Sequence, residues 1–228
     1  MRTLLAILCF VAIASVTWAE KPVQSIDVPG DRVECGFGYV EYYWDFSESD
    51  CGFTLETCDD HGVTVWEYGY WAGGDRNCWI TNLEGEYPSD AGESLVSPNF
   101  LVDSASFLVQ ISHGYNIETS YDGANLSVNG VVVSPMEGYP DDEISDSDSY
   151  YAWCVDGEPG FTGYSGGEPV YSCFDLSAFM DQEVQLSFDF GSDSSVTYPG
   201  WVIFSIRVGS SVVATEKVTW SAVKGMYR

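Results

Sequence analysis

The stretch FDFGSDSSVTYPGWVIFSIRV, residues 188–208, decides the fold class of this chain. Both of its ends alternate apolar with polar or small residues, which is the pattern of a β-strand with one buried face. Its middle is acidic and rich in serine, glycine and proline, which is typical of a turn. In the second half the alternation predicts an inward-facing set, namely Val202, Phe204, Ile206 and Val208. The stretch therefore predicts two antiparallel strands joined by an acidic loop.

The same period-two pattern recurs elsewhere in the chain. Residues 106–112 and 184–190 alternate strictly, and an Asn-Gly pair between β-branched runs in residues 126–134 predicts a tight hairpin. The inward set of the 184–190 segment is Val184, Leu186, Phe188 and Phe190. Only residues 176–182 look helical, for at most two turns. Many short strands separated by turn-rich segments predict an all-β fold, specifically an antiparallel jelly-roll β-sandwich.

The ends of the chain predict an exported protein with one folded domain. Residues 1–19 have a basic start, an apolar run and a small-residue cleavage site, which together indicate a signal peptide of bacterial type. We expect a lead-in segment at 20–39, the jelly-roll domain at 40–210 and a tail at 211–228. No later apolar run approaches the ~18 residues that a membrane-spanning helix requires. The predicted location is therefore secreted, extracellular or on the cell surface.

The net charge of −27, from 35 acidic and 8 basic residues, limits the possible partners. Nucleic acid is excluded because the chain has no basic stripe that could neutralise phosphates. Anionic membrane surfaces are disfavoured for the same reason. Clustered carboxylates could hold calcium, but an acidic surface also keeps a protein soluble and monomeric. We expect a monomer, and both explanations of the charge stay open.

Six of the seven cysteines follow the predicted signal peptide, and an even number in an exported chain predicts disulfides. They are Cys35, Cys51, Cys58, Cys78, Cys154 and Cys173. Six cysteines allow fifteen pairings. We favour Cys154 with Cys173, across the glycine-rich loop between them, and Cys51 with Cys58.

The aromatic segment at residues 66–79 is a candidate ligand-binding surface. Alternation places Trp66, Tyr68 and Tyr70 on one face, where the competing interpretation is packing inside the sandwich. We assign Trp66 to the core. Tyr70 and Trp71 remain candidates for contact with a ligand, for example by stacking on a sugar ring.

The order of several motifs resembles that of MAM-like modules and of the accessory jelly-roll domain of immune-inhibitor-A-type secreted proteins, including choice-of-anchor modules. The motifs are WDFSESDCGFT, VWEYG, NCWITNLEGEYPSD, IETSYDGANLSVNG, FTGYSGG, CFDLSAFMDQEVQLSFDFGSD and YPGWVIFSIRV. Together they extend over residues 40–208. This resemblance implies a non-catalytic module for binding, adhesion or anchoring.

The resemblance also implies a calcium site, with one departure. The closing strand of these modules usually carries an acidic pair, whereas this chain has Phe204 and Ser205 there. A calcium site of this type would then depend on Asp45, Glu118 and Asp122.

The sequence thus predicts a secreted module that binds extracellular glycan or protein, with calcium as the one candidate cofactor. The resemblance confers no catalysis, and the zinc motif H-E-x-x-H does not occur in the chain. One alternative is a glycan-active hydrolase or lyase that uses carboxylates on the same scaffold. Another is an envelope structural protein without a ligand.

Overall fold

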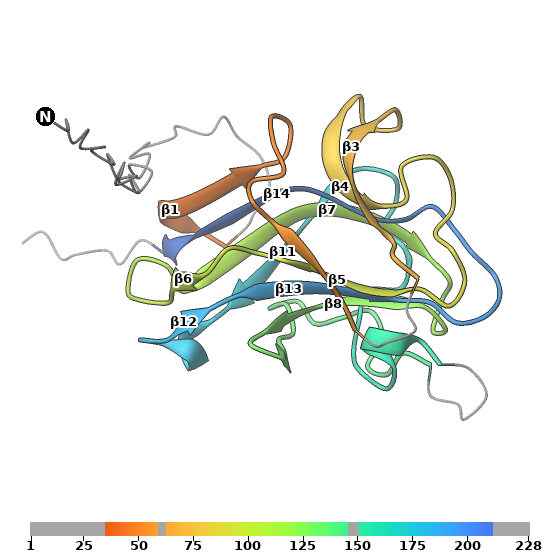
Figure 1. Ribbon diagram of the computed structural model, residues 1–228. Helices are drawn as coiled ribbons and strands as arrows, with labels where there is room; N and C mark the ends of the chain where they lie inside the picture. The colour runs from red at the N-terminus through yellow and green to blue at the C-terminus, as the bar shows by residue number, and fades with distance from the viewer. Residues whose placement is uncertain (1–34, 59–62, 146–150, 212–228) are drawn as a thin grey trace, which may run out of the picture.

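The computed structural model describes residues 35–58, 63–145 and 151–211, and these form two antiparallel sheets packed face to face (Figure 1). This confirms the predicted all-β jelly-roll sandwich. The predicted signal peptide and nearly all of the predicted tail lie outside the described residues. The first strand begins at Phe37, within the segment that the sequence assigned to the lead-in.

The large sheet has seven strands, with β14 and β7 at its centre. One side of β14 pairs with β7, and its other side pairs first with β4 and then with β1. β10 and β11 follow one another along the outer side of β7, and β3 pairs with β4. The strands are β1 (Phe37–Asp45), β3 (Trp66–Trp71), β4 (Arg76–Thr81), β7 (Leu108–Ile117), β10 (Gly163–Tyr164), β11 (Val170–Asp175) and β14 (Gly200–Ser211).

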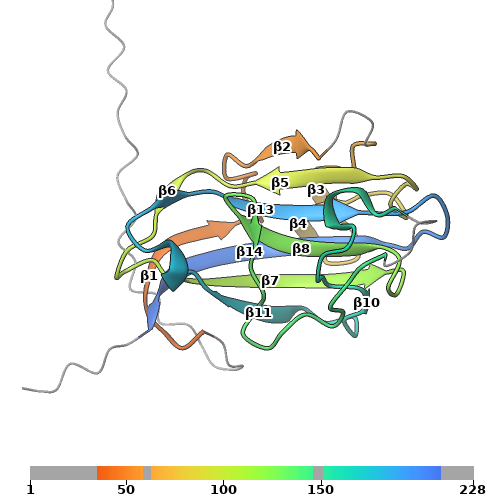
Figure 2. The same cartoon turned by 90° about the horizontal axis from the view of Figure 1, so that it is seen from below.

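The small sheet has five strands in the order β2-β5-β13-β8-β9, and Figure 2 shows four of them side by side in front of the large sheet. They are β2 (Thr54–Thr57), β5 (Gly92–Val96), β8 (Gly123–Val128), β9 (Val131–Val132) and β13 (Leu186–Gly191). A short pair, β6 (Phe100–Leu101) with β12 (Glu183–Val184), closes one end.

The core lies between the two sheets and is rich in aromatic rings. Trp201 of β14 is fully buried and packs near Trp66, Phe161 and Phe188, with ring centroids 5.4 to 6.0 Å apart. The inward residues predicted for 184–190 are all buried in this core. The predicted hairpin is also confirmed, because Asn129 and Gly130 have φ values of 50° and 77° between β8 and β9.

The inward face predicted for the last strand is wrong in its first half. Ile206 and Val208 do enter the core, but before them the core residues are Trp201 and Ile203. Val202 and Phe204 instead join a separate apolar cluster on the outer face of the large sheet. The cause is a shift of register between Ile203 and Ser205 in the pairing with β7. Such a bulge adds one residue and so exchanges the faces of every side chain on one side of it.

The favoured disulfide pairings are also wrong. The structure pairs Cys35 with Cys173 and Cys58 with Cys154, with Cα atoms 5.5 and 5.3 Å apart. Cys173 lies on β11 of the large sheet, whereas Cys154 lies in a short 3-10 helix, η1 (Trp153–Val155), that contacts the small sheet. The favoured partners are therefore attached to different sheets. Cys51 and Cys78 carry free thiols.

Helical structure is minor in the described part of the chain. Residues 176–182, which looked helical in the sequence, contain one 3-10 turn, η2 (Ser177–Phe179). Among the described residues, no helix is long and apolar enough to span a membrane.

Candidate functional site

Three carboxylates from two loops meet at one end of the sandwich. Glu118 follows β7, Asp122 precedes β8, and Asp193 follows β13. One oxygen atom from each lies within 4.8 Å of the others. Strand pairing explains the meeting of the two aspartates, because Gly191 of β13 pairs with Gly123 of β8. We call this group of Glu118, Asp122 and Asp193 the acidic cluster.

Asp122 is held in the acidic cluster by two hydrogen bonds. The Tyr87 hydroxyl donates to Asp122 Oδ2 at 2.6 Å, and the Asp193 backbone N–H donates to Asp122 Oδ1 at 2.7 Å. The Glu118 backbone N–H donates in turn to the Tyr87 hydroxyl at 3.0 Å. The Asp122 carboxylate is therefore fixed in place on both of its oxygen atoms.

The acidic cluster is not complete on its own. Asp122 and Asp193 are 0% and 1% exposed, yet Asp193 Oδ2 and Glu118 Oε2 are buried without a hydrogen-bond partner. Burial raises the pKa of Asp122 to about 7, and burial together with the Asp193 charge raises the pKa of Glu118. Buried polar groups are normally paired, but these two oxygen atoms have no partner among the described residues and are therefore available to a bound cation.

The donor set of the acidic cluster suits calcium. All three side chains offer carboxylate oxygen, which is the ligand type that Ca²⁺ prefers, and none offers nitrogen or sulfur. A divalent cation would satisfy both orphaned oxygen atoms and reduce the repulsion among three like charges. Glu118, Asp122 and Asp193 thus fit a calcium ion, which would serve there to fix the β7–β8 loop to the segment that follows β13.

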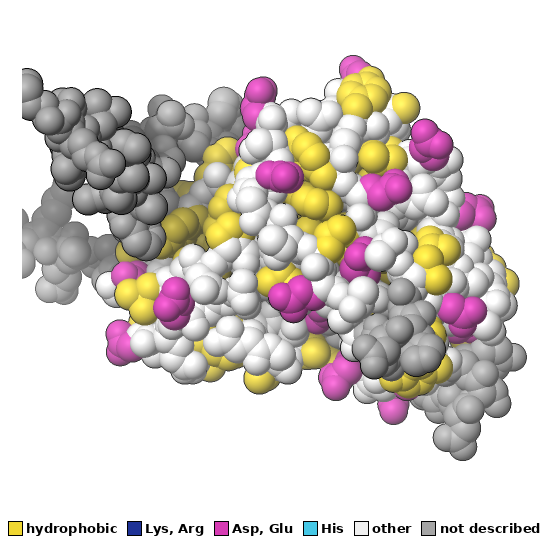
Figure 3. All heavy atoms as spheres, viewed as in Figure 1, with side chains coloured by type: hydrophobic (Ala, Val, Ile, Leu, Met, Phe, Trp, Pro, Cys, Tyr) yellow, Lys and Arg dark blue, Asp and Glu magenta, His cyan; other side chains and the backbone are white. Residues whose placement is uncertain are grey.

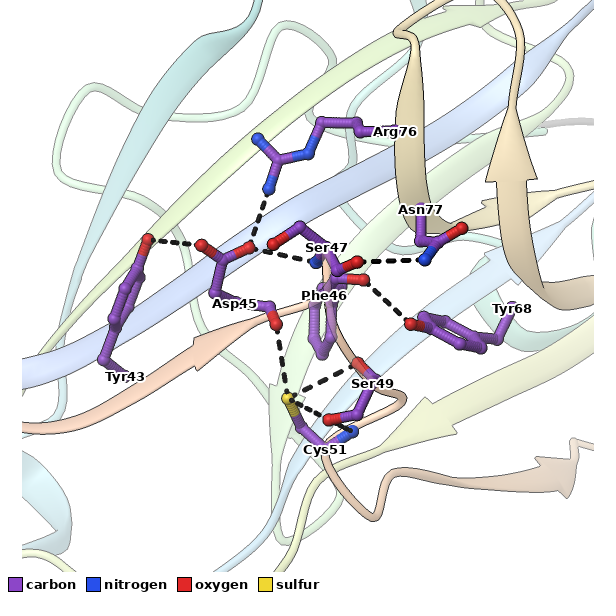
Figure 4. Close-up of polar contacts among 9 residues, drawn as sticks. All are labelled: Tyr43, Asp45, Phe46, Ser47, Ser49, Cys51, Tyr68, Arg76 and Asn77. Atoms are coloured by element: carbon purple, nitrogen blue, oxygen red, sulfur yellow. Dashed lines mark hydrogen bonds and ion pairs between the residues drawn. The ribbon is translucent and has the colours of Figure 1, made fainter. Parts of the chain in front are cut away.

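Asp45 lies outside this cluster. Figure 4 shows it at the end of β1, where Asp45 Oδ1 accepts from Arg76 Nη2 at 2.7 Å and from the Ser47 backbone N–H at 3.0 Å. Partial burial opposes ionisation, but the hydrogen bonds from Ser47 and the charge of Arg76 outweigh it and lower the pKa of Asp45. In the same view the Cys51 thiol donates weakly to the Asp45 carbonyl, with a separation of 3.7 Å.

Sequence reasoning found Glu118 and Asp122 but missed Asp193. The signal was present, because Asp193 comes two residues after the end of β13, just as Asp122 comes one residue before β8. It could be interpreted only with the knowledge that these two strands pair. Strand pairing between distant segments is not encoded in local periodicity.

His113 is the one histidine among the described residues, and it is part of the interior. It is 0% exposed, and its Nδ1 accepts from Trp201 Nε1 at 2.9 Å. Its Nε2 lies 3.1 Å from the Ser172 hydroxyl. Burial lowers the pKa of His113 to about 3, so the ring is neutral at ordinary pH. Because it cannot reach a substrate, His113 is not available as a catalytic base.

A groove of about 690 Å³ crosses the outer face of the large sheet. Its floor combines small and apolar residues, among them Gly114 of β7, Ile80 of β4 and Val202 of β14. One wall is the β3–β4 turn with Trp71, and the other is the segment that runs from Tyr164 to Tyr171. We call this the large-sheet groove.

The two aromatic candidates, Tyr70 and Trp71, lie on opposite faces of β3. Trp71 lines the large-sheet groove and packs on Phe204, with ring centroids 6.1 Å apart. Tyr70 is 60% exposed on the other face, and its hydroxyl donates to Asp75 Oδ1 at 2.5 Å. The structure therefore separates the two residues that the sequence had grouped.

A second groove, of about 540 Å³, lies on the outer face of the small sheet and is polar. At its centre Asp189 accepts hydrogen bonds from three serine hydroxyls, those of Ser94, Ser127 and Ser187, at 2.5 to 2.7 Å. The acceptor oxygens of Asp189 are thus already used within the chain.

Carboxylates are scattered over the surface of the molecule. Figure 3 shows them spread across one face with apolar patches between them and no basic side chain in view. Arg76 and Arg207 are the only Lys or Arg residues in the described ranges 35–58, 63–145 and 151–211. Both lie near aromatic rings, Arg76 over Phe204 and Arg207 over Tyr43.

No family model matches the chain. It is 24% identical over 200 residues to Bacillopeptidase F of Bacillus subtilis (strain 168), and the alignment covers 80% of this chain but only 11% of that protein. The resemblance to MAM-like modules that the sequence suggested therefore remains a prediction.

Two solved structures cover about three quarters of the chain. The K1 cleaved adhesin domain of Lys-gingipain from Porphyromonas gingivalis W83 is 12% identical with a TM-score of 0.45, and the match covers 75% of this chain and 98% of that domain. The CBM35 from Paenibacillus barcinonensis is 12% identical with a TM-score of 0.35, covering 75% and 99%.

Proposed function

We propose that this chain is an exported, monomeric, non-catalytic module that binds extracellular glycan or protein, with one structural Ca²⁺ held by the acidic cluster. The binding function is carried by the large-sheet groove. Its volume lies in the range of ligand sites, and it combines apolar walls with a small number of polar groups. The two disulfides fit a protein that folds in an oxidising compartment.

The calcium part of the proposal rests on the orphaned oxygens of Glu118 and Asp193. A buried acceptor without a donor costs about 1–3 kcal/mol, and a like-charged neighbour adds to that cost. Cation binding removes both penalties in the folded state and has no equivalent in the unfolded chain. The ion would therefore stabilise the fold rather than react.

The non-catalytic part rests on the chemistry of the described residues. His113 is buried with both ring nitrogens engaged, and Asp122 is committed to Tyr87 and to the Asp193 backbone. Neither group can approach a substrate in the large-sheet groove. The lining of the groove holds one carboxylate, Glu168, whereas glycoside hydrolysis ordinarily uses a pair.

Thermal unfolding of the wild type and of Asp193→Asn, with calcium and then with excess chelator, tests the ion. Calcium at about 100 times its Kd should stabilise the wild type by about 2.7 kcal/mol, and chelator should reverse the effect. Asp193→Asn should lose this response because it removes a ligand oxygen. Glu48→Gln, which neutralises an exposed carboxylate elsewhere, should keep it.

Either of two results would contradict the calcium site: no calcium shift in the wild type, or an undiminished shift in Asp193→Asn.

The binding function is tested with a panel of extracellular glycans and matrix proteins, and each bound ligand is recovered and sized afterwards. Recovery of intact ligand supports a binding module. Recovery of shortened ligand would instead support the hydrolase or lyase alternative.

A further inference from the structure

The large-sheet groove has aromatic rings on both walls, and the ring on the first wall is held rigidly. Trp71 packs on Phe204 from the sheet side, and the β3–β4 turn folds closely around it. A Cβ atom at either Gly73 or Gly74 would overlap the Trp71 ring, so only glycine permits this close approach. A ring fixed in this way loses little conformational entropy when a ligand stacks on it.

Tyrosines form the opposite wall. Tyr164 and Tyr171 are 66% and 45% exposed, and both line the groove. The Tyr164 hydroxyl lies against Gly167, where a Cβ atom would come within 2.6 Å of it. Tyrosine offers a large flat apolar surface together with a hydroxyl, which suits a ligand that has apolar faces and a polar edge.

The floor of the groove is kept open by Gly114. A Cβ atom at this position would make ordinary contacts, 3.5 Å from Val202 Cγ1 and 3.7 Å from Ser165 Oγ. Alanine would therefore fit, whereas a longer side chain would project into the groove. Asn116 and Ser112, further along the outer face of β7, add polar groups to the lining.

The charges of the groove favour an uncharged ligand. Its lining contains one cation, Arg76, and one carboxylate, Glu168. Arg76 is already paired with Asp45, so it offers little free positive charge. The chain as a whole carries a net charge of −27, which repels anions at long range. A basic ligand would find only one carboxylate in the groove.

The position of the groove on a sheet face disfavours an extended peptide. Peptides commonly bind by adding a strand to a sheet edge, where backbone N–H and C=O groups are free. On the floor of this groove, the backbone groups of β7, β14 and β4 are used in pairing between strands. What remains for a ligand is side-chain rings and side-chain polar groups.

We propose that the large-sheet groove binds a neutral glycan chain, stacked between Trp71 on one wall and Tyr164 and Tyr171 on the other; the inference rests on the binding function proposed above. Sugar rings have apolar faces that cover aromatic side chains and hydroxyl groups that pair with a polar rim. They need neither charge complementarity nor a free strand edge. The volume of about 690 Å³ has room for a short run of sugar units.

Isothermal titration with cellohexaose, xylohexaose and mannohexaose, and with polygalacturonate as the anionic contrast, tests this assignment. The wild type should bind at least one neutral hexasaccharide more tightly than polygalacturonate. Its affinity should not change with added NaCl, because screening acts only between charges. Tyr164→Ala and Gly114→Gln should each weaken binding by about tenfold or more, through a lost ring and a filled groove respectively.

Two matched control variants test whether a loss of affinity comes from the groove itself rather than from loss of any exposed tyrosine or from any change at Gly114. Tyr70→Ala removes a tyrosine of similar exposure, 60% against 66% for Tyr164, from the opposite face of β3, and should leave affinity within about twofold. Gly114→Ala should retain most of the affinity that Gly114→Gln loses. Circular dichroism and the calcium-induced thermal shift verify that every variant is folded.

Different results would contradict the groove assignment, the ligand class and the binding function itself. Neutral glycan binding that survives Tyr164→Ala and Gly114→Gln would overturn the groove assignment while the binding module stands. Binding of polygalacturonate or immobilised collagen, with no neutral hexasaccharide bound, would overturn the ligand class while the binding module stands. If none of these probes nor any member of the wider panel binds to the calcium-loaded protein, both proposals fail.

Discussion

Asp189 and the acidic cluster both place buried carboxylates in the sandwich, but the described residues satisfy only Asp189. Asp189, on the outer face of the small sheet, receives three serine hydroxyls and needs nothing more. The acidic cluster leaves buried oxygen atoms of Glu118 and Asp193 without a donor among the residues that the structure describes. The difference shows that burial of a carboxylate is not itself a sign of a site. What marks the acidic cluster as a candidate site is two unpartnered carboxylate oxygen atoms next to a third carboxylate.

The two outer faces of the sandwich also differ in how far their side chains are satisfied by contacts within the protein. On the small sheet Asp189 and its three serines bond to each other across β5, β13 and β8, while Asn125 Oδ1 beside them is buried without a partner among the described residues. On the large sheet apolar and aromatic side chains remain partly uncovered along the groove. The Asp189–serine group is thus satisfied within the chain, whereas the uncovered side chains of the groove are those that the proposed ligand would contact.

Among these tests, replacement of Asp189 should cause the largest loss of stability. Asp189→Ala leaves three serine hydroxyls without an acceptor in a site that is 9% exposed, and should lower the free energy of unfolding by about 3 kcal/mol. Urea unfolding in calcium and in chelator measures it. Asp189→Asn, which keeps one acceptor oxygen, should cost less. A loss that appeared only in calcium would mean that the two sets of carboxylates are not independent.

His113 is, like Asp189, a buried titratable group whose hydrogen-bond partners all lie within the protein. Its pKa in the fold, about 3, lies below the ordinary value of 6.5, so the folded chain holds it neutral. The stability that His113 contributes is therefore fully present above pH ~6.5 and falls as the pH drops, by up to about 1.4 kcal/mol per pH unit, because only the unfolded chain takes up the proton. Asp122, whose pKa is raised to about 7, contributes the opposite slope, so the effect is measured as the difference between wild type and His113→Gln in urea unfolding between pH 7 and 5. The same pH dependence in both proteins would contradict the neutral, buried histidine.

The smallest effect is expected at Asp45, the predicted calcium ligand that lies outside the cluster. Asp45 and Arg76 have side chains 37% and 36% exposed, so solvent screens their ion pair. Asp45→Asn should lower the free energy of unfolding by less than about 1 kcal/mol, and this loss should be smaller still in high salt. The calcium-induced shift should remain as in the wild type. Loss of the calcium-induced shift in Asp45→Asn would instead mean that Asp45 is a calcium ligand, as the sequence predicted.

The fold was largely predictable because its signals are local. The alternation of Val184, Leu186, Phe188 and Phe190, and the Asn129-Gly130 turn, need only neighbouring residues to be interpreted. The errors arose where distant segments decide the outcome. A bulge turned Val202 and Phe204 outward, and strand order placed Cys173 beside Cys35.

The candidate site was half predictable for the same reason. Glu118 and Asp122 lie four residues apart in one loop, so a single motif identifies both. Asp193 joins them only through the pairing of β13 with β8, which local pattern does not reveal. Trp71 is assigned to a groove because the structure shows which face of β3 is covered, and alternation alone could not decide that.

The Cys35–Cys173 disulfide also determines how the module would respond to mechanical pulling. The bond joins residues 138 positions apart, so the segment between them is a covalently closed loop. Tension applied to the two ends of the chain would pass through this bond and bypass the loop, which includes β7 and the Glu118–Asp122 part of the acidic cluster. Only the strands after Cys173, which are β12, β13, β14 and the rest of β11, could be drawn out. Under shear, stretching would therefore begin with β14, the strand next to the pulled end, and a Ca²⁺ ion on the acidic cluster would hold Asp193, in the connection between β13 and β14, against further extension.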